Sequence, residues 1–146
     1  MKENMRWEIT KQFAIHPVVD LYKSVGWIGY IDKPLQLLNG IANSSYVVSC
    51  WSDHQLIGLA RVVSDDYSIM YLQDILVHPD HHRKKIGRGL LNRCLERYAH
   101  VRQKVLLTDN RPEQVAFYES LGFVNTRNLK KDVLNAFVQF TGVQLG

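Results

Sequence analysis

The sequence predicts a single domain of the α/β class, built on a mixed sheet with helices on both faces. Short apolar runs rich in β-branched residues alternate along the chain with segments whose apolar residues recur every three to four positions. Together they give the order β-α-α-β-β-β-α-β-α-β-β. The 146 residues are 46% hydrophobic and 22% charged, which is typical of one globular domain covering residues 1–146.

The first half of the chain is predicted to hold two helices and an antiparallel hairpin. Pro34 is placed to open the second helix, because proline is tolerated in a first helical turn. A polar turn, Ser52 to His54, separates the two strands of the hairpin. In order, the expected elements are a strand within 7–14, a helix over 16–27, an aromatic glycine loop at 26–30, a helix from Pro34, and strands over 46–51 and 56–63.

The second half is predicted to alternate strands and helices. Gly122 fits the left-handed position that follows a helix, and Phe123 is the apolar residue that commonly packs back onto such a helix end. The expected elements are a strand over 69–77, a helix over 87–100, a strand over 104–108, a helix from Pro112 to Leu121, and a final strand-like run over 136–141.

A basic turn joins the 69–77 run to the following helix. Pro79 cannot donate to a sheet ladder, so the strand should end there, and Gly87 and Gly89 lie at the helix start. The first amides of a helix have no intrahelical partner and its dipole favours anions, while glycine permits close approach. The turn therefore predicts a phosphate cradle, although a basic turn that only faces solvent is the alternative.

Composition and charge narrow the function classes. A net charge of +4, gathered largely in this turn and near Lys130, suits a small anionic ligand better than nucleic acid. Cys50 and Cys94 fall in predicted core elements, which indicates a reducing compartment rather than a disulfide framework. No signal-peptide core or membrane span is apparent, so we expect a cytoplasmic protein without a membrane partner. Neighbouring histidines such as His81 and His82 rarely converge on one ion, so no metal site is expected.

Two motifs resemble those of the GCN5-related N-acetyltransferases (GNAT). Leu72 to Pro79, followed by His82 to Leu91, resembles the acetyl-CoA-binding segment of that family, and Phe117 to Phe123 resembles its second hallmark. The resemblance covers nearly the whole chain and implies the GNAT fold, a mostly antiparallel sheet with one splayed parallel pair. Shorter stretches, such as Asp74 to Val77, are similar to the plant plastid amine (serotonin-type) acetyltransferases. Lys85 departs from the family pattern, which has a glycine there; we expect its amide to serve with a negative φ.

The resemblance implies acetyl-CoA as cofactor. Residues at the end of the 69–77 strand should pair with the pantetheine arm as an added strand would, and the basic turn should hold the pyrophosphate. The expected cofactor-binding residues are Ile75, Leu76, Val77, His82, Arg83, Lys84, Lys85, Ile86, Gly87, Arg88, Asn110 and Phe117.

The family's chemistry implies a general acid and a route for the amine proton. Tyr118 is the expected acid, since a phenol beside the thioester sulfur can protonate the leaving thiolate. Asp74 is the nearest candidate base, but strict alternation places it on the face opposite Tyr71 and Gln73, and a structural hydrogen bond or a water relay stays open. The expected acceptor-binding residues are Trp27, Tyr30, Tyr71 and Gln73.

The resulting hypothesis is an acyl-CoA-dependent N-acetyltransferase that moves acetyl to a primary amine by direct attack in a ternary complex. The acceptor is a small-molecule or peptide amine whose identity the sequence leaves open. The alternative is a CoA-binding regulatory or interaction module without turnover. Dimers are common in similar proteins, so a homodimer is one expected assembly, and nucleic acid is not an expected partner.

Overall fold

The structure, a computed structural model, describes residues 4–146. The chain divides into two compact units, residues 1–107 and residues 108–146. A single domain over residues 1–146 therefore stays a prediction. None of the helices in the described residues is long and apolar enough to cross a membrane.

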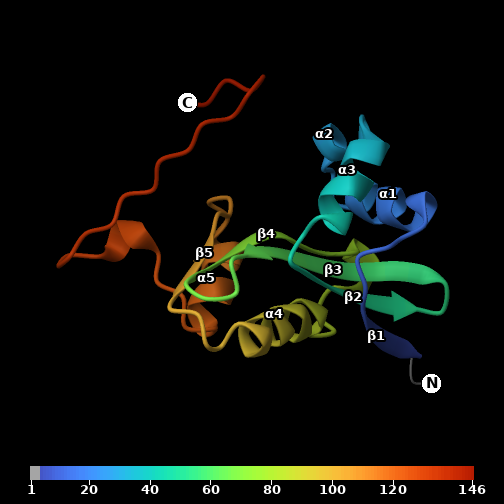
Figure 1. Ribbon diagram of the computed structural model, residues 1–146, viewed down its shortest axis with the longest axis horizontal. Coiled ribbons are helices and arrows are strands. Elements are labelled where there is room, and N and C mark those ends of the chain that lie inside the picture. The colour runs from blue at the N-terminus through green and yellow to red at the C-terminus, as the bar shows by residue number, and fades with distance from the viewer. Residues whose placement is uncertain (1–3) are drawn as a thin grey trace. The chain divides into compact units, whose positions relative to one another are not determined.

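The first unit is built on a five-stranded mixed sheet (Figure 1). Its strands lie in chain order. The first four are antiparallel and the last pair is parallel, which confirms the mostly antiparallel sheet with one parallel pair that the family resemblance implies. The strands are β1 (Met5–Ile9), β2 (Tyr46–Ser52), β3 (Gln55–Ser64), β4 (Ile69–Val77) and β5 (Gln103–Leu106). Because β2 and β3 are central and covered on both faces, their apolar runs are almost continuously buried.

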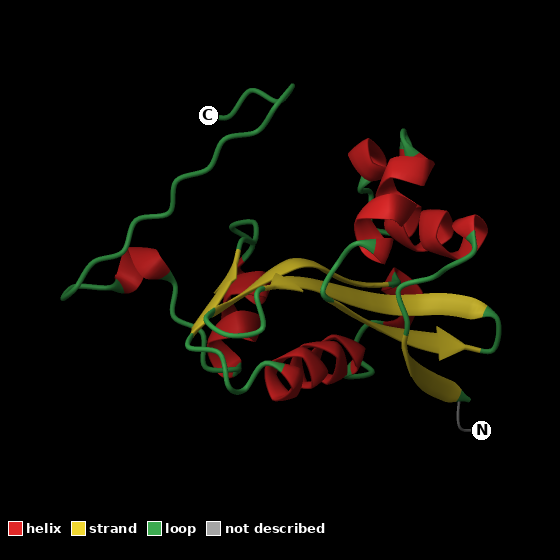
Figure 2. Cartoon of the chain, in the orientation of Figure 1, coloured by secondary structure: helices red, strands yellow, loops and turns green. Residues whose placement is uncertain are grey.

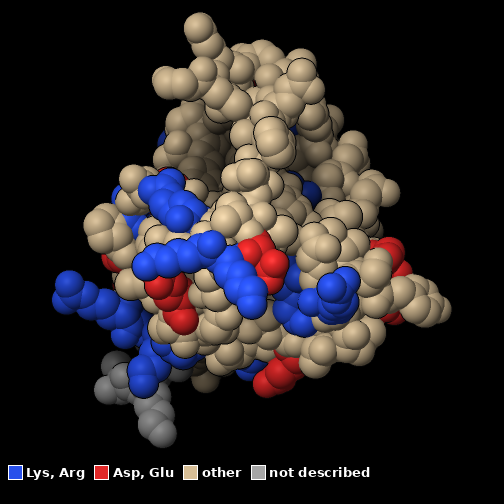
Figure 3. All heavy atoms as spheres, turned by 90° about the vertical axis from the view of Figure 1, so that its left-hand side faces the viewer, with Lys and Arg blue, Asp and Glu red and all other residues tan. Residues whose placement is uncertain are grey.

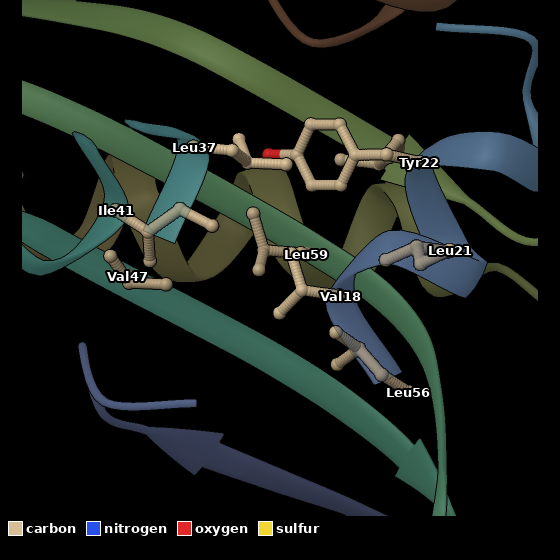
Figure 4. Close-up of a cluster of buried hydrophobic side chains, with 9 residues drawn as sticks. Val18, Leu21, Tyr22, Leu37, Ile41, Val47, Leu56 and Leu59 are labelled. Carbon is tan, nitrogen blue, oxygen red and sulfur yellow. The ribbon is translucent and has the colours of Figure 1, made fainter. Parts of the chain in front are cut away.

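Helices cover both faces of this sheet, which confirms the predicted layering (Figure 1). On one face, side chains from α1, α3 and strands β2 to β4 form a hydrophobic core cluster (Figure 4). The helices of the first unit are α1 (Ile15–Ser24), α2 (Ile28–Ile31), α3 (Pro34–Ala42) and α4 (Ile86–Arg97), with a 3-10 turn at Pro79–His81. The short helix α2 lies where the sequence predicts only an aromatic glycine loop.

Strand β4 carries a bulge that changes which face its side chains use. Arg61 of β3 pairs with Asp74, but the next residue, Val62, pairs with Leu72, so Gln73 is the extra residue. As a result Asp74 shares the α1 face with Tyr71, whose partner Val63 lies two residues beyond Arg61. The expectation that Asp74 faces away from Tyr71 and Gln73 is therefore wrong, because a bulge interrupts the alternation on which it rested.

Two glycines allow α4 to lie close against the opposite face. A Cβ on Gly58 of β3 would lie 2.9 Å from Ile86 Cγ2 and 3.2 Å from Leu90 Cδ1. A Cβ on Gly89 would lie 2.6 Å from the Trp7 ring, which also stacks under the Arg93 guanidinium at 3.7 Å. The missing side chain of Gly89 thus leaves room for the Trp7 ring and serves the packing of α4 on the sheet. Its part in a phosphate approach stays a prediction.

The second unit contains α5 (Pro112–Ser120) and a 3-10 turn at Thr126–Asn128. The end of α5 confirms the predicted cap: Gly122 has a φ of +91°, its amide donates to Glu119 O, and the Phe123 amide donates to Tyr118 O. The Phe123 ring packs edge-on against the Tyr118 ring at 6.0 Å. This cap fixes the last turn of the helix, on which Tyr118 lies.

The predicted strand over residues 136–141 is wrong. Residues 129–146 form no strand or helix (Figure 2). The segment is rich in apolar residues, as a strand would be. A strand also needs a neighbouring strand for its backbone hydrogen bonds, and no described strand pairs with this segment. Its apolar side chains are accordingly exposed, and Phe137 is 91% exposed.

Gly58→Ala is expected to lower the free energy of unfolding by about 1–3 kcal/mol, because the added methyl group must displace two fully packed side chains. Gly29→Ala in α2 is the matched control: nothing lies within 4 Å of its Cβ position, so alanine should be neutral or stabilising there. Urea unfolding of both variants measures the difference, and equal effects would refute close packing at Gly58.

Candidate functional site

The start of α4 forms a concave group of backbone amides. Lys85, the residue before the helix, has φ 60° and ψ 23°, in the left-handed region, and Ile86 begins the right-handed helix. A left-handed residue followed by a right-handed one points consecutive N–H groups toward a common point, which suits an anion. No side chain caps the helix start. The expected negative φ of Lys85 is therefore wrong, and the amides are instead aimed by a conformation that favours glycine.

The side chains around this turn are of two kinds: exposed cationic side chains and buried apolar ones. Arg83, Lys84, Lys85 and Arg88 are exposed, whereas the Ile86 side chain is buried and can contribute only its backbone. Arg83 also has a positive φ, 68°. A phosphate group therefore fits this turn in both geometry and charge. On the face that Figure 3 draws, basic side chains are interrupted by acidic ones and form no continuous basic surface.

The histidines of this segment support the turn. His82 Nε2 lies 3.0 Å from Val77 O. His78 Nδ1 accepts a hydrogen bond from the Asp80 amide. The side chain of His81 is buried, and its Nδ1 lies 3.4 Å from Lys84 Nζ. Within residues 4–146, no group of three or more His, Cys, Asp or Glu side chains could hold a metal ion.

Beyond Leu72, strand β4 has no partner in β5. Parallel pairing joins Ile69–Leu72 to Gln103–Leu106 and then ends, although β4 continues to Val77. Residues 75–77 therefore present a strand edge within the first unit, and an extended ligand can add to such an edge by main-chain hydrogen bonds. The Leu76 side chain is in the core, 4% exposed, so only its backbone faces a ligand.

Just before this open edge, Asp74 lies in a buried hydrogen-bond network. Its Oδ2 accepts from Arg61 Nε at 2.6 Å and from the Tyr22 hydroxyl at 2.9 Å, while its Oδ1 accepts from the Tyr30 hydroxyl at 2.9 Å. Gln73 Nε2 in turn donates to the Tyr30 oxygen at 3.2 Å. Asp74 is 3% exposed, so the network links the interior to the half-buried Tyr30 and the exposed Gln73.

Tyr22 and Arg61 were missed at the level of sequence. Tyr22 reads as an ordinary apolar position of a helix, and nothing in its spacing marks its hydroxyl. Arg61 does leave a signal: it interrupts an apolar strand, and a hairpin joins that strand to another apolar strand interrupted by Asp74. Opposite charges in paired buried strands are rarely tolerated unless they meet.

The aromatic residues of this region are placed by the end of α1. Gly26 has a φ of +80°, its amide donates to Lys23 O, and the Trp27 amide donates to Tyr22 O, which is the same capping geometry as at Gly122. The Trp27 ring then packs on Tyr22 at 5.8 Å and on Tyr30 at 6.0 Å. Trp27, Tyr30, Tyr71, Gln73 and Asp74 thus share one region of the first unit.

Burial keeps the phenols of this region protonated. Desolvation, followed by the negative charge of Asp74, raises the pKa of Tyr22, of Tyr30 and of Tyr71 above the ordinary tyrosine value. Each therefore remains a hydroxyl donor at neutral pH. None of the three is suited to act as a base.

The remaining predicted site residues belong to the second unit. Tyr118 is 7% exposed, and desolvation, followed by the charge of Asp109, raises its pKa to about 12. Its ring contacts that of Phe117 at 5.1 Å. Asn110 Oδ1 accepts from Arg127 Nη1 at 3.4 Å, so its carboxamide oxygen already has a partner. The cofactor and catalytic roles of Asn110, Phe117 and Tyr118 stay predictions.

The family model described as "Acetyltransferase (GNAT) domain" matches residues 22–142. The chain belongs to the GNAT acetyltransferase family. The uncharacterized N-acetyltransferase ycf52 of Gracilaria tenuistipitata var. liui is 30% identical over 117 residues, which cover 75% of this chain and 62% of that protein. This GNAT protein is an acyl-CoA-dependent N-acetyltransferase that uses acetyl-CoA; its likeness to the plant plastid subgroup stays a prediction.

Solved structures share the GNAT fold. A GNAT family acetyltransferase from Streptococcus pneumoniae superposes with a TM-score of 0.78 at 23% identity, covering 94% of this chain and 99% of the other. The aminoglycoside N-acetyltransferase AAC(6')-Iy in complex with CoA superposes with a TM-score of 0.68 at 16% identity, covering 98% of each chain. At these identities the likeness concerns the fold alone.

Lys85→Gly is expected to raise the free energy of unfolding of this GNAT domain by about 0.5–1 kcal/mol. Glycine relieves a left-handed strain of about 1–2 kcal/mol, and its own backbone entropy offsets part of that gain. Lys84→Gly removes the same charge from a residue without a positive φ and should be destabilising. Chemical denaturation compares the two variants; equal losses would contradict the strained conformation.

Proposed function

We propose that this protein transfers acetyl from acetyl-CoA to a primary amine by direct attack within a ternary complex. The observation that carries the proposal is the succession of two features: the open edge of β4 is followed, after the 3-10 turn at Pro79–His81, by the amides at the start of α4. An extended thioester with a diphosphate at its far end matches such a strip. The acceptor would be a small-molecule or peptide amine.

The binding role of the first unit follows from this strip. Backbone groups of residues 75–77 would hold the pantetheine arm, while the amides at Lys85, Ile86 and Gly87 and the cations of the turn would hold the diphosphate. With the diphosphate at the start of α4, an arm held by residues 75–77 would run back along β4, and the thioester would lie at the Gln73 end of that edge. When bound, acetyl-CoA supplies an activated acyl group on sulfur.

In the transfer itself, the amine nitrogen attacks the carbonyl carbon, the carbon–sulfur bond breaks, and sulfur leaves as a thiolate. Tyr118 would donate its hydroxyl proton to that thiolate. Its place in the motif from Phe117 to Phe123 supports this role. A pKa raised to about 12 keeps the phenol protonated until the thiolate forms. The fixed orientation of both substrates would supply much of the acceleration.

The amine must also lose a proton. Asp74 is poorly suited to take it, because its carboxylate already accepts three hydrogen bonds, one of them from a guanidinium. The phenols of Tyr30 and Tyr71 are held in their protonated forms. An ordered water relay to solvent is therefore the proposed route.

The test is thiol release from acetyl-CoA across a panel of amines: spermidine, 2-phenylethylamine, sisomicin and a lysine-containing peptide. Turnover of one or more amines, with mass-spectrometric detection of the acetylated product, supports the proposal. Binding of acetyl-CoA without turnover of any amine would contradict it.

Tyr118→Phe is expected to lower kcat about 100-fold, because the thiolate then leaves without its proton donor. The KM for acetyl-CoA should stay the same, since the ring is retained. Tyr67→Phe is the control, because Tyr67 is 85% exposed at the tip of the β3–β4 hairpin and should have no effect. An unchanged kcat in Tyr118→Phe would rule out the acid role.

The pH dependence of kcat/KM should show a single rising limb up to about pH 10. The free amine is the reactive form and its fraction grows until pH exceeds an amine pKa of about 10. The acid must stay protonated, and with a pKa of about 12 Tyr118 does so across this window. Initial rates between pH 6 and 10 provide the measurement. A falling limb near pH 8 would show that another group serves as the acid.

A further inference from the structure

The hydrogen bond between the Tyr30 hydroxyl and Asp74 has no role in the transfer chemistry proposed above. A phenol has one proton to donate, and the lone pair in the plane of its ring is its main hydrogen-bond acceptor. The Tyr30 proton is committed to Asp74 Oδ1 at 2.9 Å, and Gln73 Nε2 occupies one acceptor position at 3.2 Å. Because the Gln73 side chain is exposed, an N–H group of a ligand can replace its amide at this acceptor position. The carboxylate turns this oxygen into a group that accepts hydrogen bonds and has no proton left to offer.

The carboxylate is itself held from the opposite side. Arg61 Nε donates to Oδ2 at 2.6 Å, and Arg61 Nη1 reaches Ser44 Oγ at 3.4 Å. Gly40 of α3 leaves room for this guanidinium, since a Cβ there would lie 3.3 Å from Nη1. The orientation and depth of the Asp74 carboxylate are thus set by Arg61 of β3 and by the end of α3 with the turn that follows it, independently of Tyr30.

Exposure decreases inward along the network. Gln73 is exposed, Tyr30 is half-buried, and Tyr22 and Asp74 are fully enclosed. The polar end lies beside the Trp27 ring, which packs at 6.0 Å from that of Tyr30. An aromatic surface next to a hydrogen-bond acceptor suits a group that is cationic in solution and carries N–H bonds.

We propose that Asp74 is a positioning residue that presents the Tyr30 oxygen, beside Gln73, as the hydrogen-bond acceptor for an N–H group of the incoming amine. The inference rests on the proposed function, because it places the amine at the Gln73 end of the β4 edge, where the thioester would lie. The arrangement favours an amine that can donate one N–H bond to Tyr30 and lose the proton of another. It therefore favours primary amines over secondary amines, which have a single N–H bond. Asp74 forms no bond with the substrate in this scheme.

The test compares two phenols that donate to the same carboxylate over the same 2.9 Å. Tyr30→Phe should raise the KM for the amine about tenfold, the effect of losing one hydrogen bond to a polar substrate, with the KM for acetyl-CoA unchanged. Tyr22→Phe removes a fully buried hydroxyl, and should lower the unfolding midpoint while changing the amine KM by less than about threefold.

Asp74→Asn separates positioning from proton transfer. If Asp74 is a positioning residue, Asp74→Asn should raise the KM for the amine and leave the rising limb of the pH profile intact. The double variant with Tyr30→Phe should have an amine KM no higher than that of the more impaired single variant, because both residues act through one hydroxyl. Loss of kcat by about 100-fold with an unchanged amine KM would instead make Asp74 the base and overturn the inference.

Two further outcomes keep the inference distinct from the proposed function. If the wild type acetylates an amine and Tyr30→Phe leaves its KM unchanged, the inference fails while the proposed function stands. If the wild type binds acetyl-CoA and acetylates no amine in the panel, both fail. Because Tyr30→Phe removes only a half-buried hydroxyl, it should fold even if Asp74→Asn, which leaves Arg61 without its counter-ion, does not.

Discussion

The buried ion pair between Arg61 and Asp74 is the constraint on which the architecture of the first unit depends. Removing two charges from water is costly, and a pair of this kind persists only when its remaining hydrogen-bonding positions are also satisfied. Here α1 supplies the Tyr22 hydroxyl, α2 the Tyr30 hydroxyl, and the turn after α3 the Ser44 hydroxyl, which itself donates to Gly40 O of α3. The three helices are therefore joined to the central strands by one polar centre as well as by apolar packing.

The bulge at Gln73 makes this centre compatible with a two-sided sheet. Without the extra residue, the Asp74 side chain would lie on the α4 face of the sheet. Its carboxylate would then be buried on the face where Gly58 packs against Ile86 and Leu90. With the extra residue, Leu72 and Asp74 use opposite faces of one strand. The bulge also lies where pairing with β5 ends. The bulge thus separates the part of β4 that pairs with β5 from the part that has an open edge.

Sequence reasoning succeeded where local rules decide the outcome. Strand β4 has the predicted limits, and the helix end at Gly122 has the predicted cap, because both depend on neighbouring residues alone. It failed where the structure depends on pairing between strands that are distant in the sequence. Residues 136–141 have a strand pattern but no partner, and the face of Asp74 depends on a register shift that no periodicity reveals. The strained φ of Lys85 was misjudged because residue identity was taken to dictate conformation, whereas the connection between strand and helix did.

The close seating of α4 has a consequence for recognition. Gly58 on one side and Gly89 under the Trp7 ring let the helix rest directly on the sheet, so its first turn cannot shift without disturbing core side chains. A polyanion that meets this turn encounters amides already ordered by folding. Little conformational freedom is then lost on association, and more of the interaction energy is available as affinity. Substitutions far from the turn, on the underside of the sheet, would in this way tune how tightly the nucleotide end is held.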